Sequence, residues 1–150
     1  MTELRAHGLA LTVRRGWEAR IWLPDQPPPA ENRPVIRLAN FALPSTKDTY
    51  AEDVADTLRP GQIVASLAEF APRLADRGLY APQGVPSFDV EDLDPRAVQR
   101  HLPGRSGLQR FFSVRGRAFS LYLIARDGAG LGAALRELHT QLRALIVEPA

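Results

Sequence analysis

Cysteine is missing from this sequence of 150 residues, and lysine is nearly missing, since Lys47 is one of 19 basic residues and all the others are arginine. Without cysteine the chain forms no disulfide, holds no metal through thiolates and has no cysteine nucleophile. The three histidines, His7, His101 and His139, show neither an H-E-x-x-H motif nor a pair at metal-ligand spacing. The sequence therefore predicts no metal site.

Long hydrophobic runs are also absent from the N-terminal segment. Its apolar run, from Leu9 to Val13, covers five residues. This is too short for the core of a signal peptide or for a membrane span. We therefore expect a cytoplasmic protein that does not enter a membrane.

Acidic residues are absent between Pro95 and Arg126, although the net charge of the whole chain is only +2. This stretch contains seven arginines: Arg96, Arg100, Arg105, Arg110, Arg115, Arg117 and Arg126. They are compatible with a positive face that binds a polyanion, or with an ordinary surface whose acidic partners come from elsewhere in the fold. The second interpretation is favoured.

The composition that remains is that of an ordinary globular protein. Hydrophobic residues make up 45% of the chain and charged residues 24%. A chain of this length buries roughly 70% of its extended surface around a single core. We expect one globular domain spanning residues 1–150.

Two segments predict β-hairpins. In residues 9–23, apolar side chains alternate on both sides of Arg14, Arg15 and Gly16, a three-residue loop whose final glycine is typical of a hairpin. The aromatic segment 110–125 predicts a second hairpin that turns at Arg115 and Gly116.

The segments between the hairpins predict further strands and short helices. The proline-rich residues 24–34 indicate a stiff connector rather than a polyproline ligand. A third strand is expected at Val35 to Leu43. A capping box formed by Thr49 and Glu52 predicts a short helix near residues 50–58. Residues 61–72 fit a strand, although Ile63, Leu67 and Phe70 also fit one helical face.

Leucines dominate one face of the C-terminal segment. They recur with helical spacing at Leu131, Leu135, Leu138, Leu142 and Leu145. The sequence as a whole predicts an α+β fold. We expect an antiparallel sheet of five to six strands, built from the two hairpins and the central strands, with the C-terminal amphipathic helix packed on one face.

The start of this helix contains a G-x-G-x-x-A pattern, formed by Gly128, Gly130 and Ala133. In a dinucleotide site the strand runs straight into the first glycine, but here Arg126 and Asp127 intervene, and Asp127 would place an anion beside the phosphate. The chain also lacks the alternating strands and helices of that fold. The pattern therefore predicts a helix capped by Asp127 rather than a nucleotide site, and we expect no cofactor.

Two other motifs are incomplete. The spacing D-x-E-D-x-D, formed by Asp89, Glu91, Asp92 and Asp94, lacks the glycine and the closing glutamate of an EF-hand loop. It predicts a solvated loop, in which Asp94 caps a helical turn that begins at Pro95. Ser106 and His101 lie in a glycine-containing segment that is not G-x-S-x-G, and a polar turn is favoured there over a hydrolase site.

Two segments resemble the RNA recognition motif. Residues 115–122, RGRAFSLY, are similar to its core octapeptide, and residues 36–41, IRLANF, to its companion hexapeptide. Arg117 and Arg37 stand where that family places the aromatic rings that stack on bases. Any nucleic-acid binding is therefore expected to be weak, electrostatic and sensitive to salt.

A broader resemblance involves the two ends of the chain. A strand that leads through Gly16 and Trp17 into a second strand, with an aromatic hairpin and a closing helix that ends in LRALIV, resembles the PsbP-type α+β fold. That fold is found in photosynthetic extrinsic subunits and in a Ran-binding regulator, and Arg15 replaces its usual proline here. The resemblance implies non-catalytic docking onto a partner protein, or its regulation.

These observations predict a non-catalytic protein-interaction or regulatory domain whose partner is another protein. The alternatives are a module that binds polyanions or nucleic acid through residues 95–126 and a small nucleotide-dependent or hydrolytic enzyme. The residues proposed for the interaction surface are Arg110, Arg115, Arg117 and Trp22.

Overall fold

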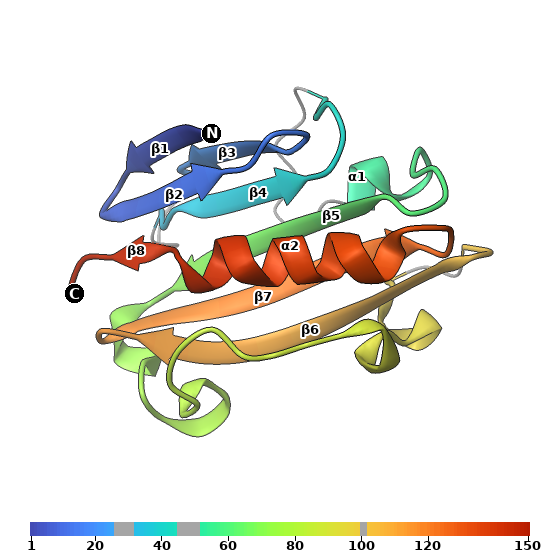
Figure 1. The fold of residues 1–150 in the computed structure, drawn as a ribbon. Coiled ribbons are helices and arrows are strands. Elements are labelled where there is room, and N and C mark those ends of the chain that lie inside the picture. Colours follow the sequence, from blue (N-terminus) through green and yellow to red (C-terminus); the bar gives the residue numbers. More distant parts are fainter. Residues whose placement is uncertain (26–31, 45–51, 100–101) are drawn as a thin grey trace.

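The computed structural model describes residues 1–25, 32–44, 52–99 and 102–150, and in these residues eight strands form two antiparallel sheets (Figure 1). The strands are β1 (Thr2–Ala6), β2 (Leu9–Val13), β3 (Glu18–Trp22), β4 (Val35–Ala39), β5 (Ile63–Phe70), β6 (Arg105–Val114), β7 (Arg117–Arg126) and β8 (Ile146–Val147). The helices are α1 (Glu52–Ala55) and α2 (Leu131–Arg143). Four short 3₁₀ helices cover Pro72–Leu74, Gly78–Tyr80, Val90–Asp92 and Pro95–Ala97.

The elements form two layers. One layer is the five-stranded sheet, in the order β3-β4-β5-β7-β6. The other consists of α2 and the small sheet β1-β2-β8, which continues from the C-terminal end of α2 (Figure 1). The main core lies between the layers, where Leu138 is 0% exposed and three further leucines of α2 are buried with it. The prediction that the leucine-rich helix covers the sheet is confirmed, but the helix ends at Arg143, so Leu145 lies beyond it and Ile146–Val147 form β8.

The first predicted hairpin is wrong, although both of its strands exist. β2 pairs with β1 and β8, whereas β3 pairs with β4 in the other sheet. The chain does turn where glycine predicts it, because Gly16 has a φ of +86° and the Trp17 N–H donates to the Arg14 carbonyl at 3.1 Å. This turn carries the chain from one layer to the other. Both strands then face the same core without pairing, so two sheets replace the single expected one.

The second predicted hairpin is confirmed. β6 and β7 are paired along their whole lengths, from Arg105 opposite Arg126 to Val114 opposite Arg117. Arg115 and Gly116 form the turn with φ values of +52° and +79°. Two consecutive positive φ values are typical of the tight turn that matches the twist of a hairpin.

The strands and the short helix predicted between the two hairpins are present, but each is shorter than predicted. Residues 61–72 form a strand, β5, and the third strand ends at Ala39 rather than at Leu43. Helix α1 lies within the predicted helical segment, while Thr49 of the proposed capping box falls outside the described residues. Around α1 a second apolar cluster packs on the opposite face of the five-stranded sheet, against Tyr122 and Ile124. Within the described ranges, no helix has the length and apolar character needed to cross a membrane.

Candidate interaction groove

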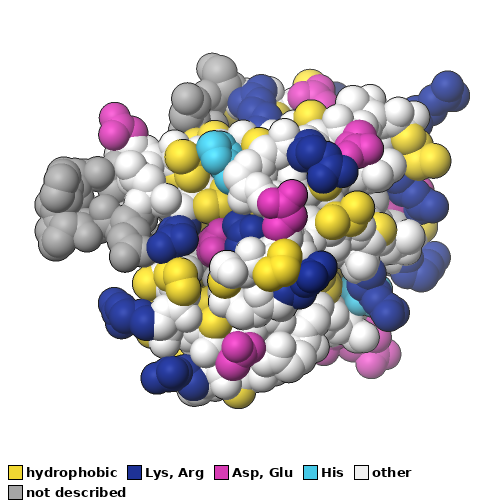
Figure 2. All heavy atoms as spheres, turned by 90° about the vertical axis from the view of Figure 1, so that its left-hand side faces the viewer, with side chains coloured by type: hydrophobic (Ala, Val, Ile, Leu, Met, Phe, Trp, Pro, Cys, Tyr) yellow, Lys and Arg dark blue, Asp and Glu magenta, His cyan; other side chains and the backbone are white. Residues whose placement is uncertain are grey.

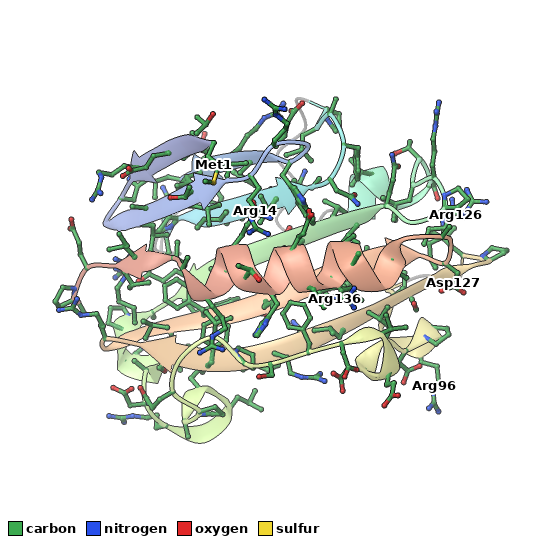
Figure 3. The ribbon with its side chains drawn as sticks, viewed as in Figure 1. Met1, Arg14, Arg96, Arg126, Asp127 and Arg136 are labelled. Atoms are coloured by element: carbon green, nitrogen blue, oxygen red, sulfur yellow. The ribbon has the colours of Figure 1, made fainter. Side chains whose placement is uncertain are left out.

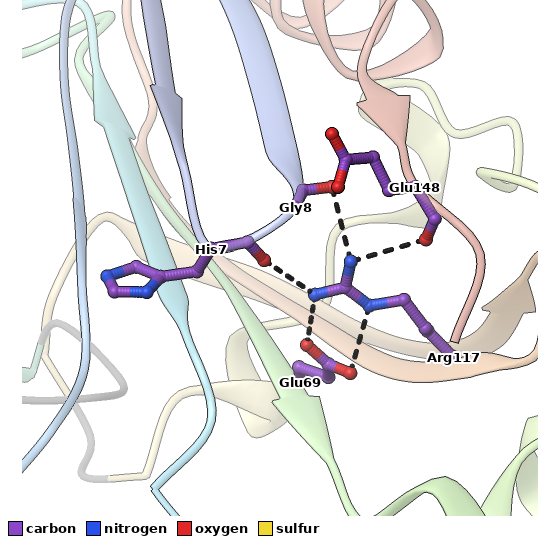
Figure 4. A network of polar contacts seen from close by, with 5 residues as sticks. All are labelled: His7, Gly8, Glu69, Arg117 and Glu148. Carbon is purple, nitrogen blue, oxygen red and sulfur yellow. Dashed lines mark hydrogen bonds and ion pairs between the residues drawn. The ribbon is translucent and has the colours of Figure 1, made fainter.

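Arg117, one of the four residues proposed for the interaction surface, lies inside the protein. The residue is 7% exposed and forms a bidentate ion pair with Glu69, in which Nη2 and Nε donate to the two carboxylate oxygens at 2.6 and 3.0 Å (Figure 4). The Arg117 guanidinium also donates to the carbonyls of His7, Gly8 and Glu148, at 3.0, 3.2 and 3.3 Å.

These five contacts use every N–H that a guanidinium offers. They connect the β5–β7 part of the large sheet to the β1–β2 turn and to the segment that follows β8 (Figure 4). Arg117 is therefore a clamp between the two layers. It has no donor left for an external partner.

Arg110 and Arg115 lie on the same hairpin but not at one site. Arg110 is half-buried, and its guanidinium lies 3.8 Å from the Asp92 carboxylate. Arg115 is exposed in the hairpin turn, five residues further on, which corresponds to about 16 Å of extended strand. Arg110, Arg115 and Arg117, all proposed for an interaction surface, therefore do not form one exposed surface.

Two other arginines of the acid-free stretch are also used internally. Arg105 donates to the carbonyls of Ala55, Asp56 and Leu58, at 3.1, 3.0 and 3.4 Å, and Arg126 donates to the Leu58 carbonyl at 2.8 Å. Guanidiniums in this position satisfy the free carbonyls that follow a helix, here α1. Arg117 and Arg110 form ion pairs with Glu69 and Asp92, which lie outside the acid-free stretch. These contacts agree with the interpretation that the arginines find their acidic partners elsewhere in the fold.

The remaining charges are dispersed. In Figure 2 the basic side chains are interspersed with acidic and hydrophobic ones over the face that is drawn. Arg96 and Arg126 lie at the end of the molecule that also holds Asp127 (Figure 3), whereas Arg117 lies at the other end of β7. The arginines of residues 95–126 do not form one basic face in the described parts of the chain.

The glycine pattern before α2 serves close packing. A Cβ on Gly128 would approach the Pro60 Cβ to 2.5 Å and the Gly61 nitrogen to 2.6 Å. The absence of a Cβ at Gly128 therefore allows the loop before α2 to contact the loop before β5. Asp127 does not cap the helix as predicted, because the N-cap is Gly130, with a φ of +84° and no side-chain cap.

The acidic motif folds onto itself. The Asp89 side chain accepts from the Glu91 N–H, and the Asp92 side chain accepts from the Asp89 N–H, so the loop forms its own capping box. Asp94 caps the 3₁₀ turn Pro95–Ala97 by accepting from the Arg96 N–H at 2.8 Å, as predicted. Within the described ranges, no three acidic or histidine side chains are grouped as metal ligands.

The other incomplete motifs contain buried or undescribed residues. Ser106 lies inside β6 opposite Ala125 and is 6% exposed, while His101 falls outside the described residues. The two segments that resemble the RNA recognition motif lie on β4 and β7, which β5 separates. Arg37 is 1% exposed, so neither this side chain nor Arg117 presents a surface to bases.

A groove runs between β1 and β3, the edge strands of the two sheets. It consists of two adjoining cavities of about 390 and 380 Å³, which share the side chains of Leu4 and Ala19. Leu4, Ala19 and Ile21 are half-buried and pack against the main core, so the floor of the groove is apolar and rigidly supported. We call these two cavities the β1–β3 groove.

The walls of the groove are unpaired strand edges. β1 pairs only with β2, and β3 only with β4, among the residues that the structure describes. An edge strand presents a row of backbone N–H and C=O groups that can hydrogen-bond to another extended chain. The β1–β3 groove therefore combines an apolar floor with unused backbone hydrogen-bonding groups.

One end of the groove is fixed by α2. The Arg14 N–H donates to Gln141 Oε1 at 2.9 Å, and the Trp17 indole N–H donates to Glu137 Oε2 at 2.7 Å. These bonds hold the turn between β2 and β3 against the helix. As a result Arg14 and Arg15, which line the groove beside Met1 and are exposed, belong to an anchored turn. Figure 3 shows Arg14 near Met1.

The other end of the groove contains Trp22, the fourth of the proposed surface residues. Trp22 is half-buried, and the Arg37 guanidinium carbon lies 5.4 Å from the centre of its ring. Arg20 lies between Trp22 and Glu18 on the same face of β3, and it donates to the Leu43 carbonyl at 2.9 Å and to the Pro44 carbonyl. Trp22 is thus the one proposed surface residue that lines the groove.

In comparisons with known proteins, no family model, curated protein or solved structure matches this chain. Function therefore has to be argued from the groove itself. Sequence reasoning missed the groove because β1 shows only weak apolar alternation, at Leu4 and Ala6. His7 and Gly8 have positive φ values, +53° and +77°, which are typical of a tight hairpin turn. The glycine at position 8 was the one sequence signal for the hairpin of β1 and β2.

Proposed function

We propose that this chain is a protein-interaction domain that binds an extended segment of a partner protein in the β1–β3 groove. In this mechanism the segment adds as a further strand to the free edge of β3. Strand addition is a common mode of peptide recognition, in which main-chain hydrogen bonds provide affinity and alternate side chains provide specificity. The observation that carries the proposal is the groove between two unpaired edge strands.

The shape of the groove suits a peptide. It runs along the five residues of β1 and the five residues of β3, which matches the length of a typical strand. Side chains of an added strand point alternately to its two faces, so every second one would lie over Ala19 and Ile21. Burial of these apolar side chains would stabilise the complex beyond the main-chain hydrogen bonds.

A substitution that fills the groove tests the proposal. A phage-displayed library of random 12-residue peptides is selected on the full chain, and the enriched peptides are synthesised and measured by fluorescence anisotropy. We expect Ala19→Arg to weaken their binding at least about tenfold, because an inward-pointing charge blocks an edge strand. Ala133→Arg is the matched control, since it adds the same charge at an exposed position of α2.

A second measurement does not depend on the variants. Methylating the backbone nitrogens of a bound peptide one at a time removes one donor at each step. In strand addition the effect should alternate along the peptide, because only every second residue of the added strand donates to β3. The proposal is wrong if peptides bind Ala19→Arg and Ala133→Arg equally, if none is enriched, or if methylation has no alternating effect.

A further inference from the structure

The charges that line the β1–β3 groove are mostly of one sign. Four partly or fully exposed arginines and the buried Arg37 line it, against a single carboxylate, Glu18. Glu18 already accepts a hydrogen bond from the Leu43 N–H at 3.1 Å. A partner that lies in this groove therefore meets an excess of positive charge.

The arginines differ in what they already contact. Arg5 forms an exposed ion pair with Glu3 at 2.8 Å. Arg20 donates to two backbone carbonyls, which leaves its charge without a carboxylate. Arg14 and Arg15 are exposed, and neither guanidinium has a hydrogen bond or an ion pair within the parts of the chain that the structure describes.

The backbone that carries two of these charges, at Arg14 and Arg15, is held in place before a partner arrives. Hydrogen bonds from the Arg14 N–H and from Trp17 hold the turn on α2, so the two side chains lose only their own rotamer freedom on binding. The acidic groups of a peptide are carboxylates, and a guanidinium binds a carboxylate through two parallel hydrogen bonds.

We infer that the segment bound in the β1–β3 groove is acidic, with apolar side chains on one face and carboxylates on the other. This inference rests on the proposed function. One carboxylate lies beside Arg20, as an opposite-charge pair across neighbouring strands. Another lies at the end of the groove, where Arg14 and Arg15 bind it. An acid opposite Glu18 is disfavoured because like charges directly opposite are destabilising.

A peptide fits these features better than a nucleic acid. The groove has an apolar floor and walls of backbone N–H and C=O groups, which pair with another peptide backbone. Single-stranded nucleic acid instead needs aromatic side chains on which successive bases stack. In the groove Trp22 is half-buried and already lies against Arg37.

The test uses a library of nine-residue peptides with Val, Ile or Leu at every second position and an equal mixture of Glu, Ser and Lys between them. The library is passed over the immobilised full chain at about 100 mM salt, where charge interactions are screened beyond about 10 Å. In the retained peptides we expect Glu to exceed Lys at least about fivefold. The double variant Arg14→Gln/Arg15→Gln should reduce this ratio at least about threefold.

Two matched controls separate the possible outcomes. Arg73→Gln/Arg77→Gln removes the same charge at two exposed arginines outside the groove and should leave the ratio unchanged. If retention is lost in Ala19→Arg but Glu is not enriched, or if both double variants lower the ratio equally, the inference is wrong and the proposed function stands. If retention is the same in Ala19→Arg, the proposed function fails and the inference with it.

A final competition addresses the other class of macromolecule. A labelled peptide from the retained pool is titrated with a single-stranded oligonucleotide of 20 nucleotides. We expect no displacement at about 100 mM salt. Displacement by the oligonucleotide, together with oligonucleotide binding that Ala19→Arg abolishes, would assign the groove to nucleic acid and overturn the inference.

Discussion

The two edges of the five-stranded sheet differ in how they are covered. At the β6 edge, residues 82–94 run alongside the strand and pair with it near both ends (Figure 1), with Gly84 and Pro82 bonded to Ser113 at 2.8 Å and Asp94 bonded to Gly107 at 2.8 and 3.0 Å. At the β3 edge, no described segment pairs with the strand. Proteins commonly cover their edge strands to avoid unwanted pairing. β3 has β1 of the other layer beside it but no strand paired with it, so this edge is a candidate for pairing with a partner segment.

The Arg117 clamp holds the β1–β2 turn, which follows one wall of the groove, against the large sheet, and its removal should have the largest effect. Arg117→Ala leaves the Glu69 carboxylate, whose side chain is 2% exposed, without its charge partner. Loss of one member of a buried ion pair costs about 3–5 kcal/mol. We expect a decrease of this size in the free energy of unfolding by urea. Amide exchange in β1 should also accelerate, because His7 and Gly8 lose their bonds to the guanidinium.

A matched control lies two residues away. Arg115→Ala removes an exposed arginine from the same hairpin and should change the free energy of unfolding by about 0.5 kcal/mol or less. A loss below about 1 kcal/mol for Arg117→Ala would show that the clamp does not hold the two layers together. The double variant Glu69→Ala/Arg117→Ala should lose less than the sum of the single losses, because the two side chains share one interaction.

The covered edge can be loosened at Asp94, with a smaller effect. Asp94 caps the 3₁₀ turn Pro95–Ala97 and its backbone pairs with Gly107 of β6. We expect Asp94→Ala to accelerate exchange of the Gly107 amide roughly fivefold, the usual size of an N-cap effect. Asp94→Asn should leave it nearly unchanged, since asparagine is an equally good N-cap. Equal exchange in both variants would mean that the cap does not hold this edge.

The same cap responds to acid. The Arg96 backbone N–H, which donates to the Asp94 carboxylate, lowers the pKa of that carboxyl from 3.8. A lowered carboxyl pKa contributes stability above the unfolded value and loses it as the pH falls through the folded value. Gly107 exchange, corrected for its intrinsic pH dependence, should therefore stay constant down to about pH 3.8 and rise below it.

Local sequence patterns predicted β2 to β7 and α2, but they predicted neither β1 nor β8, nor the pairing of the first hairpin. The turn at Arg115 and Gly116 was predictable because both strands alternate and the turn is short. The turn at Gly16 has the same local signals, yet the strands on its two sides belong to different sheets. Which strands pair is set by contacts far along the chain, which a local pattern does not contain. Likewise Arg117 contacts residues 31 to 110 positions away, so no local pattern indicates that it is buried.

The candidate site was less predictable than the fold. Of the residues proposed for an interaction surface, only Trp22 lines the β1–β3 groove. Arginine-rich stretches indicate a binding face only when the arginines stay free, and here the fold uses Arg105, Arg117 and Arg126 to satisfy carbonyls and a carboxylate. Arg14 and Arg15 carry the available charge, but in the sequence they are indistinguishable from an ordinary polar turn.

The smallest expected effect is a pH-dependent loosening of the covered edge at His139. His139 lies on α2 and its ring meets that of Phe88, in the segment that covers β6, at 5.2 Å between centroids. Burial, with a further contribution from the positive charge of Arg143, lowers the pKa of His139 from 6.5, while the Pro86 carbonyl acts in the opposite direction. The folded state therefore favours the neutral ring.

Because this pKa is lower in the folded state, the unfolded chain binds more protons between the folded value and about pH 6.5. Stability should rise with pH across this window, so that it decreases as the pH falls below about 6.5. We expect His139→Gln to flatten the pH dependence of the urea midpoint in this range, and likewise the pH dependence of amide exchange at Gly107 and Ser113, corrected for its intrinsic rate. An unchanged pH dependence in His139→Gln would show that protonation of His139 does not loosen the segment that covers β6.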